Sequence, residues 1–259
     1  MKKIWSVALA VAGLGVNLAN AQFAERVVSY DPGIGYAAGF TNSEAALGEP
    51  SRINPFTEAT DPFDPPYGRD QIVSIGTGGS LVLEFNPPIL NHPQNAFHLD
   101  FTIFGNSGFI ITNDFDVTTF EWIGTPATDG SLFAQNTGTS QVSVSQDGQH
   151  FYAVTPANHG ASADVLFPTD GAGDFQIPVY PGVEQSDFAG ATLEDIREIY
   201  NGSAGGTSFD ISTARDENGQ ATLLHQIRFV RIEVLNGKVE IDGAAAVARH
   251  PDKKQQHRL

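Results

Sequence analysis

The stretch Ile227-Arg228-Phe229-Val230-Arg231-Ile232-Glu233-Val234 decides the fold class of this chain. Within it, Val230, Ile232 and Val234 alternate with residues that are aromatic or charged. Strict alternation of this kind is typical of a β-strand that buries one face in a core and turns the other face outward. The stretch therefore predicts a half-buried strand of an antiparallel sheet.

Similar alternation recurs on the N-terminal side of this stretch and just after it, and it predicts roughly eight to ten short strands. Runs of this kind lie at 81–85, 97–103, 117–123, 142–144 and 239–241, and further strands are expected over 26–30 and 71–75. A hairpin turn is expected at Asp147-Gly148, because both residues tolerate a positive φ. The side chains that we expect in the core are Leu81, Leu83, Phe85, Phe101, Ile103, Val142, Val144, Val230 and Ile232.

One helix is expected after Thr192. Thr192 and Asp195 resemble a capping box, and Ile196 follows at helical spacing. The segments 31–70 and 155–210 are rich in turn-forming residues and predict long loops, which in compact domains are usually functional or ion-bound. Because strands predominate without alternating helices, the fold class is all-β: an antiparallel two-sheet β-sandwich with one short helix and long loops.

The chain is acidic and contains no cysteine. It carries 14 Lys and Arg against 30 Asp and Glu, which gives a net charge of −16. This charge disfavours nucleic acids and anionic membrane surfaces as partners, because both require basic side chains. The absence of cysteine excludes disulfides, thiolate catalysis and Cys-based zinc sites. The fold must therefore be held by core burial, by a bound metal ion, or by both.

Residues 1–21 have the pattern of an export signal peptide. Lys2 and Lys3 precede an apolar run, and Ala19-Asn20-Ala21 forms a small-x-small cleavage site. Cleavage there removes two Lys and no acid, so the net charge changes from −16 to −18. The cleavage point has no Cys for a lipid anchor, and no later run is long enough for a membrane span. We expect an exported protein, secreted or periplasmic, with one β-sandwich domain over 22–250 and a flexible polar tail over 251–259.

Three segments occur in an order that resembles a known fold family. Gly78 to Phe85 is a glycine turn that leads into a strand, Val142 to Phe151 contains a strand and the Asp-Gly turn, and 227–234 is a late strand. This order resembles the discoidin-like (galactose-binding-like) jelly roll. It is more closely similar to a group of bacterial exported cell-surface proteins, some of which carry a PEP-CTERM sorting tail. Further segments of that pattern are Pro32–Ser51, Asp100–Asn106, Gly205–Ile211 and Val239–Asp242.

The resemblance implies a non-catalytic binding or structural module of a bacterial cell surface, with a glycan or another surface polymer as partner. The chain departs from the pattern of that group at three positions. Gly105 stands where such proteins commonly have Glu, and Thr207 and Glu240 stand where they commonly have Asp. The chain also lacks the sorting tail, so anchoring by that route is not expected.

The resemblance also implies a structural Ca²⁺ that ties an early loop to the final strand. The matching positions are Asn42, Glu49, Glu240 and Asp242. Carboxylate and amide oxygens of this kind are the ligands that Ca²⁺ prefers. The alternative is that Glu240 and Asp242 form an ordinary solvated face of the last strand.

Aromatic residues in the long loops are candidates for stacking on sugar rings. These ligand-binding candidates are Phe40, Phe56, Tyr67 and Tyr180, with Phe63 considered beside them. The alternative is that these rings pin the loops to the core. The sequence contains no His-Glu-x-x-His motif and no phosphate-binding loop. An alternative function is a secreted carbohydrate-active hydrolase that uses paired carboxylates from distant positions.

Overall fold

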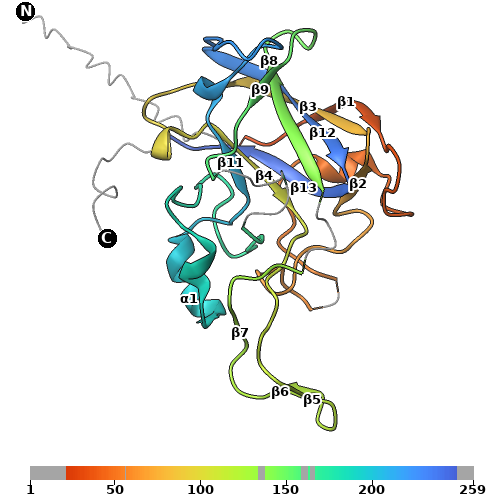
Figure 1. The fold of residues 1–259 in the computed structure, drawn as a ribbon, viewed down its shortest axis with the longest axis vertical. Helices are drawn as coiled ribbons and strands as arrows, with labels where there is room; N and C mark the ends of the chain where they lie inside the picture. The colour runs from red at the N-terminus through yellow and green to blue at the C-terminus, as the bar shows by residue number, and fades with distance from the viewer. Residues whose placement is uncertain (1–21, 56, 134–137, 159–162, 164–166, 250–259) are drawn as a thin grey trace, which may run out of the picture.

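The computed structural model describes residues 22–55, 57–133, 138–158, 163 and 167–249 (Figure 1). The expected signal peptide over 1–21 and the expected tail over 251–259 lie outside the described residues. Two antiparallel sheets stack against each other, and long connecting segments gather on one side of this sandwich. The expected fold class, an all-β two-sheet sandwich with one short helix and long loops, is confirmed.

The larger sheet has five strands in the order β1-β3-β12-β8-β9, and every neighbouring pair is antiparallel. The expected hairpin at Asp147-Gly148 is confirmed: Gly148 has a positive φ, and Asp147 accepts hydrogen bonds from the backbone N–H groups of Gln149 and His150. The strands are β1 (Arg26–Asp31), β3 (Ser80–Leu90), β8 (Thr139–Ser145), β9 (Tyr152–Val154) and β12 (Gln226–Asn236).

The smaller sheet has four strands in the order β11-β4-β13-β2, again antiparallel throughout. Its strands are β2 (Val73–Gly76), β4 (Phe101–Gly105), β11 (Thr207–Phe209) and β13 (Lys238–Ala246). Gly237 joins β12 to β13 with a φ of 73°, so the two central strands are consecutive in the chain although they belong to different sheets. A non-glycine residue would be strained in that conformation.

The main core lies between the two sheets. All nine side chains that the alternating pattern predicts as core are buried there, including Leu83 on β3, Val144 on β8 and Ile232 on β12. Phe101 on β4 stacks against Phe209, its cross-strand partner on the neighbouring β11 of the smaller sheet, with the ring centroids 5.0 Å apart. Apolar burial of this extent supplies the main stabilisation of a chain that has no disulfide.

The outer face of the smaller sheet is also covered. Phe104 and Ala245 on that face pack against Phe175 and Ala204 from the loop-rich segment. β13 is therefore buried along nearly its whole length, and only 5% of Glu240 and 2% of Asp242 is exposed. The alternative that these two acids form a solvated sheet face is wrong, because loops cover the face on which they lie.

The helix α1 (Leu193–Tyr200) begins as expected. Thr192 accepts a hydrogen bond from the backbone N–H of Asp195, and the Asp195 side chain accepts one from the backbone N–H of Thr192. The buried face of α1, Ile196 and Tyr200, packs on Phe167 and Phe188 and builds a second apolar cluster within the loop-rich segment. The remaining short elements are β7 (Ala127–Thr128), β10 (Ala191–Thr192) and the 3₁₀ turns η1 (Ser43–Ala46), η2 (Ala96–His98), η3 (Gln185–Phe188) and η4 (Ile211–Thr213).

Two expected strands differ in the structure. The run 97–103 begins as a strand only at Phe101, because Phe97 and His98 adopt positive φ values and Asp100 turns inward. There Asp100 accepts hydrogen bonds from the backbone N–H groups of His92 and Ile211.

The run 117–123 is not one strand. It forms the turn and second strand of a small hairpin, β5 (Phe115–Asp116) with β6 (Glu121–Trp122). Figure 1 shows this hairpin at the end of an arm that projects away from the sandwich. The aromatic and β-branched residues of the run do not find a core there, so they do not continue into a long strand.

Candidate functional site

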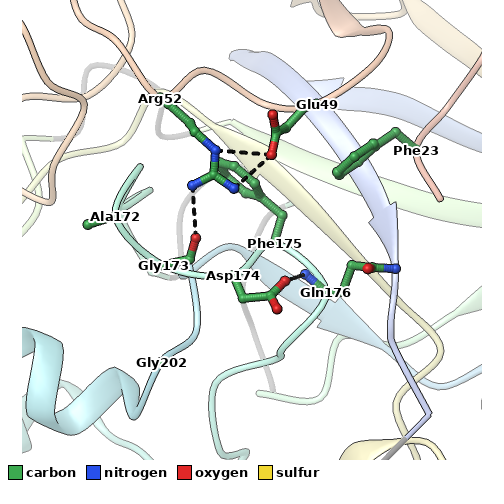
Figure 2. A pocket seen from close by; sticks show the side chains of 9 residues that line it. All are labelled: Phe23, Glu49, Arg52, Ala172, Gly173, Asp174, Phe175, Gln176 and Gly202. Atoms are coloured by element: carbon green, nitrogen blue, oxygen red, sulfur yellow. Dashed lines mark hydrogen bonds and ion pairs between the residues drawn. The ribbon is translucent and has the colours of Figure 1, made fainter. Parts of the chain in front are cut away.

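A pocket of about 510 Å³ lies where three segments meet beside the outer face of the smaller sheet. Figure 2 shows the residues that line it. They come from the N-terminal segment, from the loop that holds Glu49 and Arg52, and from the loop-rich segment, including the turn that follows α1. The lining residues are Phe23, Glu49, Arg52, Ala172, Gly173, Asp174, Phe175, Gln176 and Gly202.

Arg52 connects the early loop to the loop-rich segment. Its Nε and Nη2 atoms donate to Glu49 Oε1 at 3.0 and 2.7 Å. Its Nη1 atom donates to the carbonyl oxygens of Gly171 and Gly173 at 2.5 and 3.1 Å. The guanidinium also lies over the Phe175 ring, 4.6 Å from the ring centroid, where a cation–π attraction adds to the hydrogen bonds. Arg52 is thus a structural part of the pocket wall.

The loop Asp170-Gly171-Ala172-Gly173-Asp174 forms that wall because two of its residues carry no side chain. A Cβ on Gly173 would lie 2.2 Å from the carbonyl oxygen of Ser203, and a Cβ on Gly171 would lie 2.8 Å from Arg52 Cα. At its start the loop is anchored by the buried carboxylate of Asp170, which accepts hydrogen bonds from Arg197 Nε and Nη2 on α1. Close approach and anchoring together fix the shape of the wall.

Polar and aromatic groups face each other across the pocket. Asp174 Oδ1 accepts the backbone N–H of Gln176 at 2.8 Å, which orients the carboxylate at the rim. Phe23 and Phe175 meet edge to face with their centroids 6.5 Å apart. The pocket therefore offers carboxylate and amide oxygens, a guanidinium and ring surface within one cavity.

The segment that holds Glu49 and Arg52 is tied to the last strand by a buried acid. Asp242 Oδ2 accepts the backbone N–H of Ser51 at 2.8 Å, and Asp242 Oδ1 accepts the Ser51 hydroxyl at 2.7 Å. Burial raises the pKa of Asp242 to about 7, although the two hydrogen bonds from Ser51 act in the opposite direction. This pair joins an early loop to the final strand, the two elements that the resemblance to cell-surface proteins connects through calcium.

The four expected calcium ligands take different partners. Glu240 accepts hydrogen bonds from Lys238 Nζ at 2.9 Å and Asn106 Nδ2 at 2.7 Å. The Asn42 side chain caps η1 by accepting the backbone N–H of Glu44. Within the described ranges, no group of three or more His, Asp or Glu side chains is arranged to hold a metal ion. The observed donors, one of them a lysine, do not fit a calcium centre built from these residues, and the calcium that the resemblance implies is untested.

The expected ligand-binding aromatics are spread over the surface rather than gathered at the pocket. Tyr67 stacks on Phe133, and Tyr180 meets Phe97 edge to face. Phe40 is half-buried. Phe63, also half-buried, packs against the cluster under α1, and Phe56 lies outside the described residues. The ring contacts of Tyr67, Tyr180 and Phe63 match the alternative in which loop aromatics hold the loops.

The carboxyl groups with the clearest raised pKa values do not line the pocket. Burial raises the pKa of Asp100 to about 6 and that of Asp242 to about 7. Both are held by hydrogen bonds from protein groups beneath the surface. The pocket acids are Glu49 and Asp174, and hydrolysis at this pocket would have to use that pair.

Sequence reasoning placed Glu49 at a functional site, but it did not find Arg52, Asp174 or Gln176. The sequence signal for this pocket wall was the pair of glycines at 171 and 173. They lie in the segment 155–210, whose length was the reason to expect a functional loop there. Among the helices of the described residues, none is long and apolar enough to cross a membrane. Compared with known proteins, this chain matches no family model and no curated sequence.

Proposed function

We propose that this protein is an exported, non-catalytic binding module of a bacterial cell surface and that the pocket around Arg52 takes a carbohydrate. The observation that carries the proposal is the combination of lining groups in one cavity of about 510 Å³. Small-molecule pockets generally have volumes of a few hundred Å³ and a few polar groups that fix the orientation of the ligand. Export and surface location rest on the signal-peptide pattern and on the resemblance to cell-surface proteins.

The lining chemistry suits sugar hydroxyl groups. A hydroxyl both donates and accepts, so it pairs with a carboxylate such as Asp174 and with a side-chain amide such as Gln176. The half-buried ring of Phe23 supports the apolar face that a pyranose presents through its C–H groups. Convergence of such groups from separate segments is typical of a binding site.

The charge of the pocket favours neutral sugars or amino sugars over acidic ones. Arg52 makes four hydrogen bonds to protein acceptors. A guanidinium has five N–H donors, so this arginine retains little capacity for a carboxylate or sulfate on the ligand. The carboxylates of Glu49 and Asp174 would repel such a group, because like charges at close range disfavour binding.

A glycan-array screen tests the proposal. We expect binding of neutral or amino-sugar glycans and no binding of uronic acid or sulfated glycans. Asp174→Asn keeps the hydrogen bond to the backbone N–H of Gln176 but removes the charge, and it should weaken binding at least about ten-fold, equivalent to 1.4 kcal/mol. The matched control is Asp31→Asn, because Asp31 likewise accepts a backbone N–H two residues ahead and does not line the pocket.

Two results would overturn the proposal. The first is binding that Asp174→Asn and Asp31→Asn reduce equally, which would place the sugar elsewhere. The second is release of new reducing ends from a bound glycan, lost in both Glu49→Gln and Asp174→Asn, which would identify the protein as the hydrolase of the alternative reading.

A further inference from the structure

The arm over residues 109–132 is a built structure that carries β5 and β6 at its end. Phe109 bridges Leu132 at the base, and the backbone N–H of Ile110 donates to Ser131 at 2.8 Å. Further out, Asn113 Nδ2 donates to the carbonyl oxygens of Ile123 and Thr125. These contacts hold the hairpin away from the sandwich at the far end of the molecule (Figure 1).

The tip of this arm exposes apolar side chains that pack mainly on one another. Phe115 meets Trp122 at 5.0 Å and Phe120 at 6.3 Å between ring centroids, both edge to face. Val117 is 74% exposed and Phe120 is 79% exposed. A gathering of large exposed apolar side chains usually marks an interaction surface, because leaving them in water is unfavourable.

Phe120 has a second unusual property, its backbone conformation. Its φ is 59°, in the left-handed region where a bulky residue is strained and glycine is not. Burial of the ring does not compensate this strain, since the side chain is the most exposed of the tip aromatics. The turn holds this conformation, because the backbone N–H of Phe120 donates to the carbonyl oxygen of Asp116 at 2.8 Å. Strained residues that the surrounding structure holds in this way cluster at sites of function.

The tip has an acidic face opposite its aromatic face. Phe115 pairs with Trp122 across the hairpin, and Asp116 pairs with Glu121 on the other side. Two acids directly opposite each other are unfavourable in a free hairpin. No Lys or Arg occurs anywhere between Arg69 and Arg197 in the sequence. The segments that flank the hairpin therefore supply no basic residue to balance these acids.

We propose that this tip docks into an apolar groove of another protein whose rim carries Lys and Arg side chains. The projecting shape requires a concave partner, the rings supply the buried anchor, and Asp116 and Glu121 supply the complementary charge. A second copy of the chain would bring acids against acids. Insertion into a lipid bilayer would carry the carboxylates of Asp116 and Glu121 into the membrane together with Trp122, and burying charged groups in a membrane costs free energy.

Photo-crosslinking in the cell that makes the protein tests this docking. Benzoylphenylalanine replaces Val117, and a control chain carries it at Leu223, which is 74% exposed and lies outside the arm. We expect the Val117 probe to give one dominant protein adduct, which the Leu223 probe does not give. The adduct peptide should contain apolar residues with neighbouring Lys or Arg.

The cross-linked protein is then purified and its affinity for the full chain is measured. Phe120→Gly should weaken binding at least ten-fold without lowering the melting temperature, because glycine relieves the strain. Asp116→Asn combined with Glu121→Gln should also weaken binding and reduce its dependence on salt concentration. An adduct with lipid only, no adduct, or equal affinity of Phe120→Gly and wild type would each overturn the proposal.

Discussion

Asp242 is a single residue on which the pocket depends, although it does not line the pocket. Its carboxyl group holds Ser51 through two hydrogen bonds, and Ser51 directly precedes Arg52. The last strand, β13, therefore holds the segment from Glu49 to Arg52 in position through Asp242. A buried carboxyl with a pKa of about 7 makes this support dependent on pH near neutrality.

The free energy of unfolding should fall as the pH rises from about 4 to about 7. An unfolded Asp has a pKa of about 3.9, whereas folding raises the pKa of Asp242 to about 7 and that of Asp100 to about 6. The folded state then binds more protons than the unfolded state across this window, so raising the pH favours unfolding. Urea unfolding at several pH values measures the slope.

Asp242→Asn is the variant for this measurement, because an amide retains both an acceptor for the Ser51 N–H and a partner for its hydroxyl. The slope between pH 4 and 7 should become shallower in this variant. Asp31→Asn, at an exposed carboxyl, should leave the slope as in the wild type. A slope that is the same in all three proteins would contradict the assignment of this titration to Asp242.

At the scale of elements, α1 holds the pocket loop through Arg197. The helix has eight residues, and an isolated helix of that length is not stable in water. It depends on its reciprocal capping box and on the apolar cluster beneath Ile196 and Tyr200. Loss of the cap therefore acts on the Asp170–Arg197 pair and on the loop that this pair anchors.

Thr192→Ala should lower the free energy of unfolding by about 1 kcal/mol, because the backbone N–H of Asp195 loses its acceptor. Thr192→Ser keeps the hydroxyl and should cost less than half as much. Chemical denaturation of the two variants beside the wild type checks the difference. Equal stability of Thr192→Ala and wild type would show that the cluster alone holds the helix.

A helix or strand could be predicted where its sequence pattern reflects which of its faces is buried. An element whose sequence pattern does not correspond to burial could not be predicted. Leu83 and Ile232 belong to strands in which apolar and polar residues alternate, because a core lies on one side of each strand. The two-residue period therefore predicts both strands and their buried side chains. Thr192 and Asp195 are a local signal that does not depend on the rest of the fold. Phe120 has the same strand-forming character as Leu83, but a sequence window does not tell whether a core is present to receive it.

The candidate site was less predictable for a similar reason. Arg52 and Asp174 are far apart in the sequence, and only the covering of the outer sheet face brings them together. The alternation along β13 predicts a solvated face for Glu240 and Asp242, and the resemblance implies a metal site, because alternation distinguishes two faces but does not show that both are covered. Loop packing of this kind is a property of the whole chain.

At the scale of the whole molecule, the net charge of −16 raises the question of what offsets the acids. The buried acids already have protein partners, namely Arg197 for Asp170, Lys238 for Glu240 and Ser51 for Asp242. We therefore expect a chelator to leave the melting temperature unchanged. Thermal unfolding in EDTA and in excess calcium measures this. A decrease in EDTA that calcium reverses would establish the calcium site that the sequence resemblance implies.

The position of the last two strands has a consequence for biogenesis. β12 lies between β3 and β8 in one sheet, and β13 lies between β4 and β2 in the other. Until residues 226–246 leave the ribosome, the strand pairs β1-β3 and β8-β9 remain unconnected and β2 has no neighbour in its sheet. Cooperative folding must then wait for nearly complete synthesis, and such non-local pairing is slow. A chain that stays unfolded during its own translation remains threadable, which is the state that a secretion channel for unfolded polypeptides requires.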